Sequence, residues 1–289
     1  MRISALRAAQ LCLMAYQHAS VVDLAHRDAR GEPDVLEAVR GASTRPLLFT
    51  SSAGAQVYWM VVGDRDGVVA ARGADSREDF CYDAAAVAVP VRAPGGGAGG
   101  GRFHAGFVAQ YRSVAVPLRE RVADLLGGDP EATVTFVGHS TGAAVAALAC
   151  TDAAGAHGPS RLRYVGLGCP KSADAAFAAA FEGAAAVRVL VVNGADPVCK
   201  LFSCGSALDA TETVRLGARD PRPDALPSPF DLRDHAVRSY VASARAAEGP
   251  ATTPTPPTPA PAPTPSPTPT PIPWWRRLLC FSWLGGPGA

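Results

Sequence analysis

The chain lacks an excess of charge of either sign. Its 289 residues carry a formal net charge of +1 at pH 7. Nucleic-acid-binding proteins gain much of their affinity from clustered Lys and Arg, so this balance argues against a nucleic-acid partner. The same balance provides no broad electrostatic attraction to an anionic membrane.

The N-terminal region lacks a long hydrophobic run. Its longest apolar stretch extends only from Leu11 to Tyr16, and Arg7, Gln10 and His18 interrupt the flanking sequence. A secretory signal needs a longer apolar segment, and a transmembrane helix needs about 20 apolar residues. We therefore expect an amphipathic first helix, no signal peptide, no transmembrane segment and a cytoplasmic protein.

Cysteine spacing typical of metal sites is also lacking. The seven cysteines are scattered, and their number is odd. We therefore expect no metal site, and a reducing compartment is the default. The function predicted below implies no organic cofactor either. Cys199 and Cys204 bracket a short loop; they are expected to be free thiols, or a local disulfide in an oxidising compartment.

What the chain does contain is a strand, a tight turn and a helix around one serine. The β-branched run from Thr133 to Val137 leads into Gly138-His139-Ser140-Thr141-Gly142, and small apolar residues follow from Ala143 to Leu148. In such a nucleophile elbow the serine backbone is strained, and a side chain two residues before or after it would collide with the strand or helix. The pattern predicts that Ser140 is a nucleophile.

A serine nucleophile needs a histidine base, which follows the serine and an acid on α/β-hydrolase scaffolds. Only His157 and His235 follow Ser140 in the chain. His157 stands in a Gly- and Pro-containing loop at the end of the elbow helix, so His235 is the predicted base. His104 is expected to be a structural hydrogen-bonding residue, and His139 to point away from the cleft.

The acid that orients the base is predicted to be Asp196. It follows the β-rich run from Val187 to Val192, and acids at the carboxyl end of a buried parallel strand face the active site in this kind of sheet. Five other carboxylates compete for the role: Asp174, Asp209, Asp224, Asp231 and Asp234. The last two adjoin His235 in sequence and are expected to cap the helix that begins there.

Alternation of strands and helices in the second half predicts an α/β fold with a mixed, mostly parallel sheet and helices on both faces. Strands are expected at residues 56–62 and 68–71 as a hairpin, near 86–91, in the elbow strand, and at 164–168 and 187–192. Helices are expected at residues 4–18, 105–126, after Ser140, near 174–182 and at 234–247.

Five blocks outside the elbow carry a recognisable pattern. They are Val68 to Phe80, Phe103 to Phe107 with Tyr111, Gly168 to Lys171 with Phe177, Val192 to Val198, and Asp234-His235 with Tyr240. In this order, and together with Gly138 to Gly142, they resemble the class 3 or fungal-type lipases of the α/β-hydrolase superfamily. The resemblance implies the α/β-hydrolase fold and a Ser140, Asp196, His235 triad.

The resemblance also implies an oxyanion hole built from the N–H groups of Ala74 and Thr141. The family usually has Thr or Ser at position 74, so alanine keeps the backbone donor and loses the hydroxyl. Loss of one such donor costs about 2.7 to 4 kcal/mol in the transition state. A lid would map to Ser76 to Val87, hinged by the glycine-rich stretch from 93 to 101; an ordinary loop is the equal alternative.

Composition changes after the predicted catalytic domain, which spans residues 1–248. Residues 249–273 alternate Pro with Thr and Ala and should form a disordered, semi-rigid spacer. Residues 274–289 form a hydrophobic tail rich in Trp and Arg, too short to span a bilayer. This tail is a candidate anchor on a membrane or lipid surface; a peptide that docks on another protein, or a tail without function, are the alternatives.

Together these features predict a serine-dependent carboxylic ester hydrolase (EC 3.1.1 type) acting on lipid esters, with acylglycerols as the first substrates. A phospholipase A1-type acyl hydrolase would use the same residues. A non-catalytic lipid-binding scaffold on a retained hydrolase fold is the alternative from another class, although a protein that had lost catalysis would have no chemical reason to keep all three triad residues.

Overall fold

A seven-stranded sheet organises the part of the chain that the computed structural model describes, namely residues 3–74, 87–91, 100–200, 208, 210–217 and 232–249. The strands lie in the order β1 (Leu47–Thr50), β2 (Gln56–Val62), β3 (Asp66–Ala71), β6 (Thr133–His139), β7 (Leu162–Leu167), β8 (Val187–Asn193) and β9 (Glu212–Leu216). The pairs β1–β2 and β2–β3 are antiparallel, and the four pairs from β3 to β9 are parallel. The predicted hairpin and mostly parallel sheet are confirmed.

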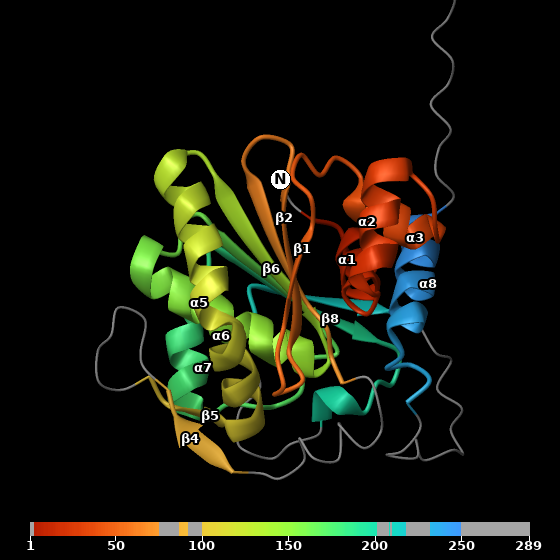
Figure 1. Cartoon of the computed structure of the whole chain (residues 1–289). Coiled ribbons are helices and arrows are strands. Elements are labelled where there is room, and N and C mark those ends of the chain that lie inside the picture. The colour runs from red at the N-terminus through yellow and green to blue at the C-terminus, as the bar shows by residue number, and fades with distance from the viewer. Residues whose placement is uncertain are drawn as a thin grey trace, which may run out of the picture. The chain divides into compact units, whose positions relative to one another are not determined.

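Helices cover both faces of this sheet, as predicted (Figure 1). One face packs against α5 (Ala105–Gly128), α6 (Thr141–His157) and α7 (Ala175–Glu182), and the other against α1 (Ala5–Ala15), α2 (Ala19–Asp28), α3 (Pro33–Val39) and α8 (Val237–Glu248). A small ribbon of β4 (Ala88–Pro90) and β5 (Arg102–His104) leads into α5. A short 3₁₀ helix, η2 (Val198–Lys200), follows β8.

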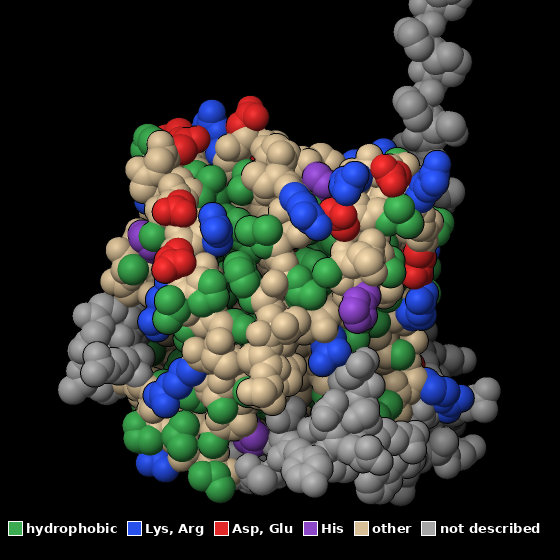
Figure 2. Space-filling view, in the orientation of Figure 1, with side chains coloured by type: hydrophobic (Ala, Val, Ile, Leu, Met, Phe, Trp, Pro, Cys, Tyr) green, Lys and Arg blue, Asp and Glu red, His purple; other side chains and the backbone are tan. Residues whose placement is uncertain are grey.

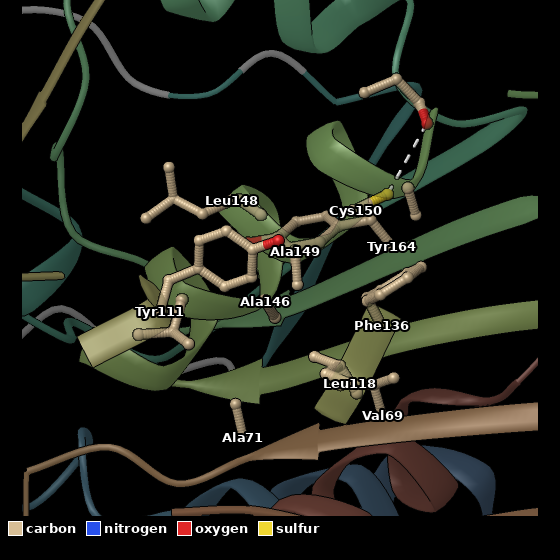
Figure 3. Close-up of a cluster of buried hydrophobic side chains, with 14 of the residues drawn as sticks. Val69, Ala71, Tyr111, Leu118, Phe136, Ala146, Leu148, Ala149, Cys150 and Tyr164 are labelled. Carbon is tan, nitrogen blue, oxygen red and sulfur yellow. Dashed lines mark hydrogen bonds between the residues drawn. The ribbon is translucent and has the colours of Figure 1, made fainter. Parts of the chain in front are cut away.

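Strand alternation sends neighbouring side chains into two separate cores. In β6, Phe136 packs toward α5 and α6, whereas Val137 packs toward α1. Figure 3 shows the first core, where Phe136 and Val69 of the sheet lie near Leu118 of α5 and the small residues of α6. Full burial of one such large side chain stabilises the fold by about 1.5 to 3 kcal/mol. Alanines on α6 let the helix lie close to the sheet.

The predicted first helix runs three residues too far. It ends at Ala15, with Tyr16 as its C-cap, and His18 becomes the N-cap of α2. The Gln56 side-chain amide donates to the carbonyl oxygens of Ala15 and Gln17 at 2.7 and 3.0 Å, which holds the chain in a turn there. That contact joins residues about 40 positions apart, so local periodicity could not indicate it.

Charged side chains of both signs are interspersed on the surface view of Figure 2, in line with the balanced net charge. Among the described residues, the structure has no helix that is both long enough and apolar enough to cross a membrane. Several predicted segments lie outside the described residues: the lid up to residue 86, residues 93–99 of the glycine-rich stretch, Cys204, most of the spacer and the whole tail.

Candidate active site

Ser140 stands at the sharp turn between β6 and α6, in a strained backbone conformation. Its φ of 57° and ψ of −130° lie where residues other than glycine rarely occur. A Cβ on Gly138 would lie 2.2 Å from the Gly142 carbonyl oxygen, and one on Gly142 would lie 2.4 Å from the Ala71 oxygen. Both glycines of the motif are therefore sterically required, as the sequence pattern predicted.

His235 joins Ser140 to Asp196 in one hydrogen-bonded line. Its Nε2 lies 2.8 Å from Ser140 Oγ, and its Nδ1 lies 2.9 Å from Asp196 Oδ2 and 3.0 Å from Oδ1. All three residues are buried. A neutral imidazole that donates from Nδ1 to the carboxylate presents the Nε2 lone pair to the serine hydroxyl, so this arrangement fits a catalytic triad.

The Asp196 carboxylate has two further donors. Tyr240 donates its hydroxyl to Oδ2 at 2.6 Å, and the Val198 N–H donates to Oδ1 at 2.9 Å. Burial acts to raise the pKa of Asp196, but hydrogen bonding and charge interaction with His235, with the bonds from Tyr240 and Val198, outweigh it and lower the pKa. The carboxylate is therefore held ionised as an acceptor. Tyr240 was not predicted as a site residue; the Tyr five positions after His235 was the available signal.

Gly168 closes the site from the loop after β7. Its φ is +57°, and a Cβ there would lie 2.7 Å from Asp196 Oδ2 and 3.0 Å from His235 Nδ1. Only glycine both adopts this conformation and leaves room for the acid and the base. This explains the Gly at the start of the Gly168 to Lys171 block.

The competing acids that the structure describes have other partners. Asp174 caps α7 by accepting a bond from the Phe177 N–H at 2.8 Å. Asp234 was expected to cap the helix after His235, and this is wrong: its Oδ2 accepts the Ala195 N–H at 2.9 Å, so it fastens the loop that carries Asp196. The helix begins only at Val237, and its N-cap has no side-chain hydrogen bond. Asp209, Asp224 and Asp231 lie outside the described residues.

His104 and His139 are buried, whereas His157 is half-buried. The His104 backbone N–H donates to the Ser172 carbonyl oxygen at 2.9 Å, and the His104 ring centroid lies 4.3 Å from that of Phe107. His139 lies behind the base, with its Nε2 2.7 Å from the His235 carbonyl oxygen. Sequence reasoning expected His139 to point away from the cleft and did not foresee this contact.

The two predicted oxyanion residues come from different segments: Thr141 directly follows Ser140, and Ala74 follows strand β3. Thr141 is buried and opens α6, where backbone N–H groups have no acceptor within the helix and the helix dipole favours negative charge. Ala74 follows Gly73, whose Cβ position would lie 2.8 Å from Ser140 Cβ. The backbone that leads to Ala74 therefore passes beside the nucleophile. Among the described residues, no group of three or more His, Cys, Asp or Glu could hold a metal ion.

Sequence comparison finds relatives of this chain. Residues 68–206, which include Ser140 and Asp196 and end before His235, match the family model for Lipase (class 3). The rice protein phospholipase A1-II 4 (Oryza sativa subsp. japonica) is 29% identical over 210 residues, covering 65% of this chain and 52% of the relative. The chain thus spans about half the length of that curated relative.

Comparison with solved structures confirms the fold. A fungal lipase in complex with an inhibitor, described as a model for interfacial activation, has a TM-score of 0.59 at 20% identity and covers 83% of this chain and 96% of its own. The lipase–propeptide complex of Rhizomucor miehei has a TM-score of 0.58 at 22% identity, with coverages of 69% and 62%. The described part of the chain therefore has the α/β-hydrolase fold.

Proposed function

Because this chain belongs to the class 3 lipases of the α/β-hydrolase superfamily, we propose that it is a serine-dependent carboxylic ester hydrolase acting on lipid esters. The observation that carries the proposal is the buried line from Ser140 Oγ through the His235 imidazole to the Asp196 carboxylate. A protein that used this fold only to bind lipid would not need that line.

The geometry supports a two-step acyl transfer. Ser140 Oγ attacks the ester carbonyl while His235 Nε2 takes the hydroxyl proton, and Asp196 stabilises the imidazolium. The N–H groups of Thr141 and Ala74 would bind the oxyanion of the tetrahedral intermediate. The intermediate collapses as His235 returns the proton to the leaving alcohol. Water, deprotonated by His235, then attacks the acyl-serine and releases the carboxylic acid.

Acylglycerols are the first proposed substrates, because the solved structures that share the fold include a triacylglycerol lipase. An acyl ester of a phospholipid is the second, because the rice relative is a phospholipase A1. The two differ in head group and not in the bond cleaved, so the triad serves either. We also propose that the protein is cytoplasmic and that its Trp- and Arg-rich residues 274–289 contact a lipid surface.

Labelling by a fluorophosphonate probe tests the proposal before any substrate is known. We expect rapid covalent labelling of the purified full chain, and its loss in Ser140→Ala and in His235→Ala. Ser113→Ala, an exposed serine on α5, is the matched control and should label like the wild type. A folded wild type that does not label would move the interpretation to a non-catalytic lipid-binding scaffold.

A vesicle assay then separates the two substrate classes. Release of fatty acid from emulsified triacylglycerol and from phosphatidylcholine vesicles is compared for the wild type and for Ser140→Ala. Activity on triacylglycerol alone supports the lipase proposal, and activity confined to phospholipid supports the phospholipase A1 alternative.

A further inference from the structure

Two residues that the proposed reaction does not use form a hydrogen-bonded line behind the base. The Tyr16 hydroxyl lies 2.8 Å from His139 Nδ1, and His139 Nε2 lies 2.7 Å from the His235 carbonyl oxygen. The His139 and His235 rings are 4.7 Å apart at an interplanar angle of 30°. These contacts bring together the end of α1, the residue before the nucleophile and the backbone of the base.

One proton arrangement satisfies both contacts. The His235 carbonyl can only accept, so Nε2 of His139 carries the proton and donates it. Burial, and then the neighbouring His235, lower the pKa of His139 to about 3, so its ring is neutral and Nδ1 is an acceptor. The Tyr16 hydroxyl therefore donates to Nδ1. Since its proton is engaged there, this hydroxyl cannot at the same time replace the oxyanion donor missing at Ala74.

His235 needs support because it stands outside regular secondary structure. Its N–H bonds to the Leu232 carbonyl in a turn, and α8 begins two residues later with Ala236 as N-cap. The first carbonyl in the hydrogen-bond pattern of α8 is that of Ala236, so the His235 carbonyl lies outside that pattern. The His139 Nε2–H donates to this carbonyl oxygen at 2.7 Å and so holds the backbone of the base.

The fit of Tyr16 into this line is tight. A Cβ at Gly73 would lie 2.6 Å from the Tyr16 hydroxyl oxygen and 2.7 Å from the His139 carbonyl oxygen. The hydroxyl thus fills the space that the missing side chain of Gly73 leaves. The same glycine lies beside Ser140 and directly before Ala74. The contacts from Tyr16 through His139 therefore connect the backbone of the base with the segment that carries Ala74.

We propose that His139 and Tyr16 are positioning residues: His139 holds the His235 backbone so that the imidazole stays aligned on Ser140, and Tyr16 holds His139 in the tautomer that can do so. This role rests on the proposed function, because it acts through the base. Misplacement of a reacting group by about 1 Å can cost roughly 100-fold in rate. The effect should fall on kcat, since neither side chain needs to contact the substrate.

Two amide substitutions at His139 separate positioning from packing. The amide nitrogen of His139→Gln occupies the place of Nε2 and can still donate to His235, whereas the amide of His139→Asn occupies the place of Nδ1 and cannot reach. With a short soluble nitrophenyl ester, we expect His139→Asn to lose about 10- to 100-fold in kcat with little change in KM. His139→Gln should recover most of that loss. Circular dichroism and thermal melting verify that both variants are folded.

The tautomer is tested by a signal that packing alone would not move. In ¹⁵N-histidine-labelled protein, His139 should show a protonated Nε2 and an unprotonated Nδ1, and Tyr16→Phe should shift that distribution and lower kcat. Equal kcat in the wild type, His139→Asn and Tyr16→Phe, or equal losses in His139→Asn and His139→Gln, would overturn the positioning role alone. A folded wild type that neither labels with fluorophosphonate nor cleaves the ester would overturn the proposed function and, with it, this role.

Discussion

The two sides of Ser140 are built differently. On the side of the base, the Asp196 carboxylate accepts bonds from His235, Tyr240 and the Val198 N–H, and the backbone of the base is itself fastened. On the side of the oxyanion, position 74 is an alanine, which offers its backbone N–H and no hydroxyl. If the proposed function holds, hydrogen bonds position every residue that takes part in proton transfer, whereas stabilisation of the oxyanion limits the rate.

The largest effect on kcat is expected from a substitution on the side of the base, at Asp196. Asp196→Asn would leave the fold in place but remove the charge that holds the His235 tautomer, so kcat should fall by about 10⁴-fold. Steady-state hydrolysis of a soluble ester measures this loss. Asp174→Asn is the matched control: asparagine caps a helix about as well as aspartate, so this variant should leave both stability and kcat nearly unchanged. Equal activity of Asp196→Asn and the wild type would remove Asp196 from the mechanism.

Addition of a hydroxyl donor on the side of the oxyanion should raise kcat. Ala74→Ser adds the hydroxyl that the family usually supplies, and one such donor is worth about 100-fold in kcat. Ala74→Gly keeps the N–H and adds no hydroxyl, so it should not show the gain. The assay is again kcat on a soluble ester, with the labelling rate as a second readout. An unchanged kcat in a folded Ala74→Ser would show that the oxyanion is not bound beside position 74.

A smaller loss is expected from Tyr240→Phe, which removes one donor from Asp196. A hydrogen bond to a charged group contributes about 1.5 to 3 kcal/mol, so chemical denaturation should show a loss of that size in the free energy of unfolding. The pKa of Asp196 should rise toward its ordinary value, because the bond from Tyr240 helps to lower it. The acid limb of the activity profile should therefore move to higher pH.

Tyr111→Phe provides the control for that prediction. It removes a comparable Tyr–Asp bond, to Asp152, from the opposite face of the sheet. It should cost stability without moving the acid limb. If the acid limb moved in both variants, the cause of the shift would be general destabilisation of the fold and not the lost bond to Asp196.

Sequence patterns predicted the parts of the site that local rules govern. Ser140 lies in a turn whose glycines have steric causes, and Asp196 follows a strand whose β-branched residues are recognisable by themselves. His235 came from chain order. Each of these signals is contained in a short segment, so one sequence was enough to bring the three residues into one hypothesis.

The missed parts depend on contacts between distant segments. The Tyr240, Tyr16 and His139 bonds exist because α8 and α1 pack together on the same face of the sheet, and no local pattern indicates that packing. Among the described residues, six short elements were also missed, namely α2, α3, β1, β5, η2 and β9. The edge strand β9 has only five residues, with Glu212, Thr213 and Arg215 among them, so it lacks the apolar run that made β8 recognisable.

The last predicted effect is on stability in acid rather than on activity, and it tests a contact that sequence reasoning missed. The pKa of His139 is lowered to about 3 by burial and then by His235, whereas the pKa of an unfolded histidine is about 6.5. Between these values the unfolded chain binds a proton that the folded chain does not, so stability falls as the pH falls, by about 1.4 kcal/mol per pH unit. Asp196, Tyr16 and Tyr240 also face this ring.

His139→Gln isolates that contribution, because it removes the titrating ring and keeps its neighbours. Urea denaturation across the acid range should show a shallower decline for this variant than for the wild type. His157→Gln, at the end of α6, removes an imidazole away from the site and should decline as the wild type does. Parallel declines for the wild type and His139→Gln would mean that His139 takes up its proton in the folded chain, and the assignment of Nδ1 as acceptor for Tyr16 would then be wrong.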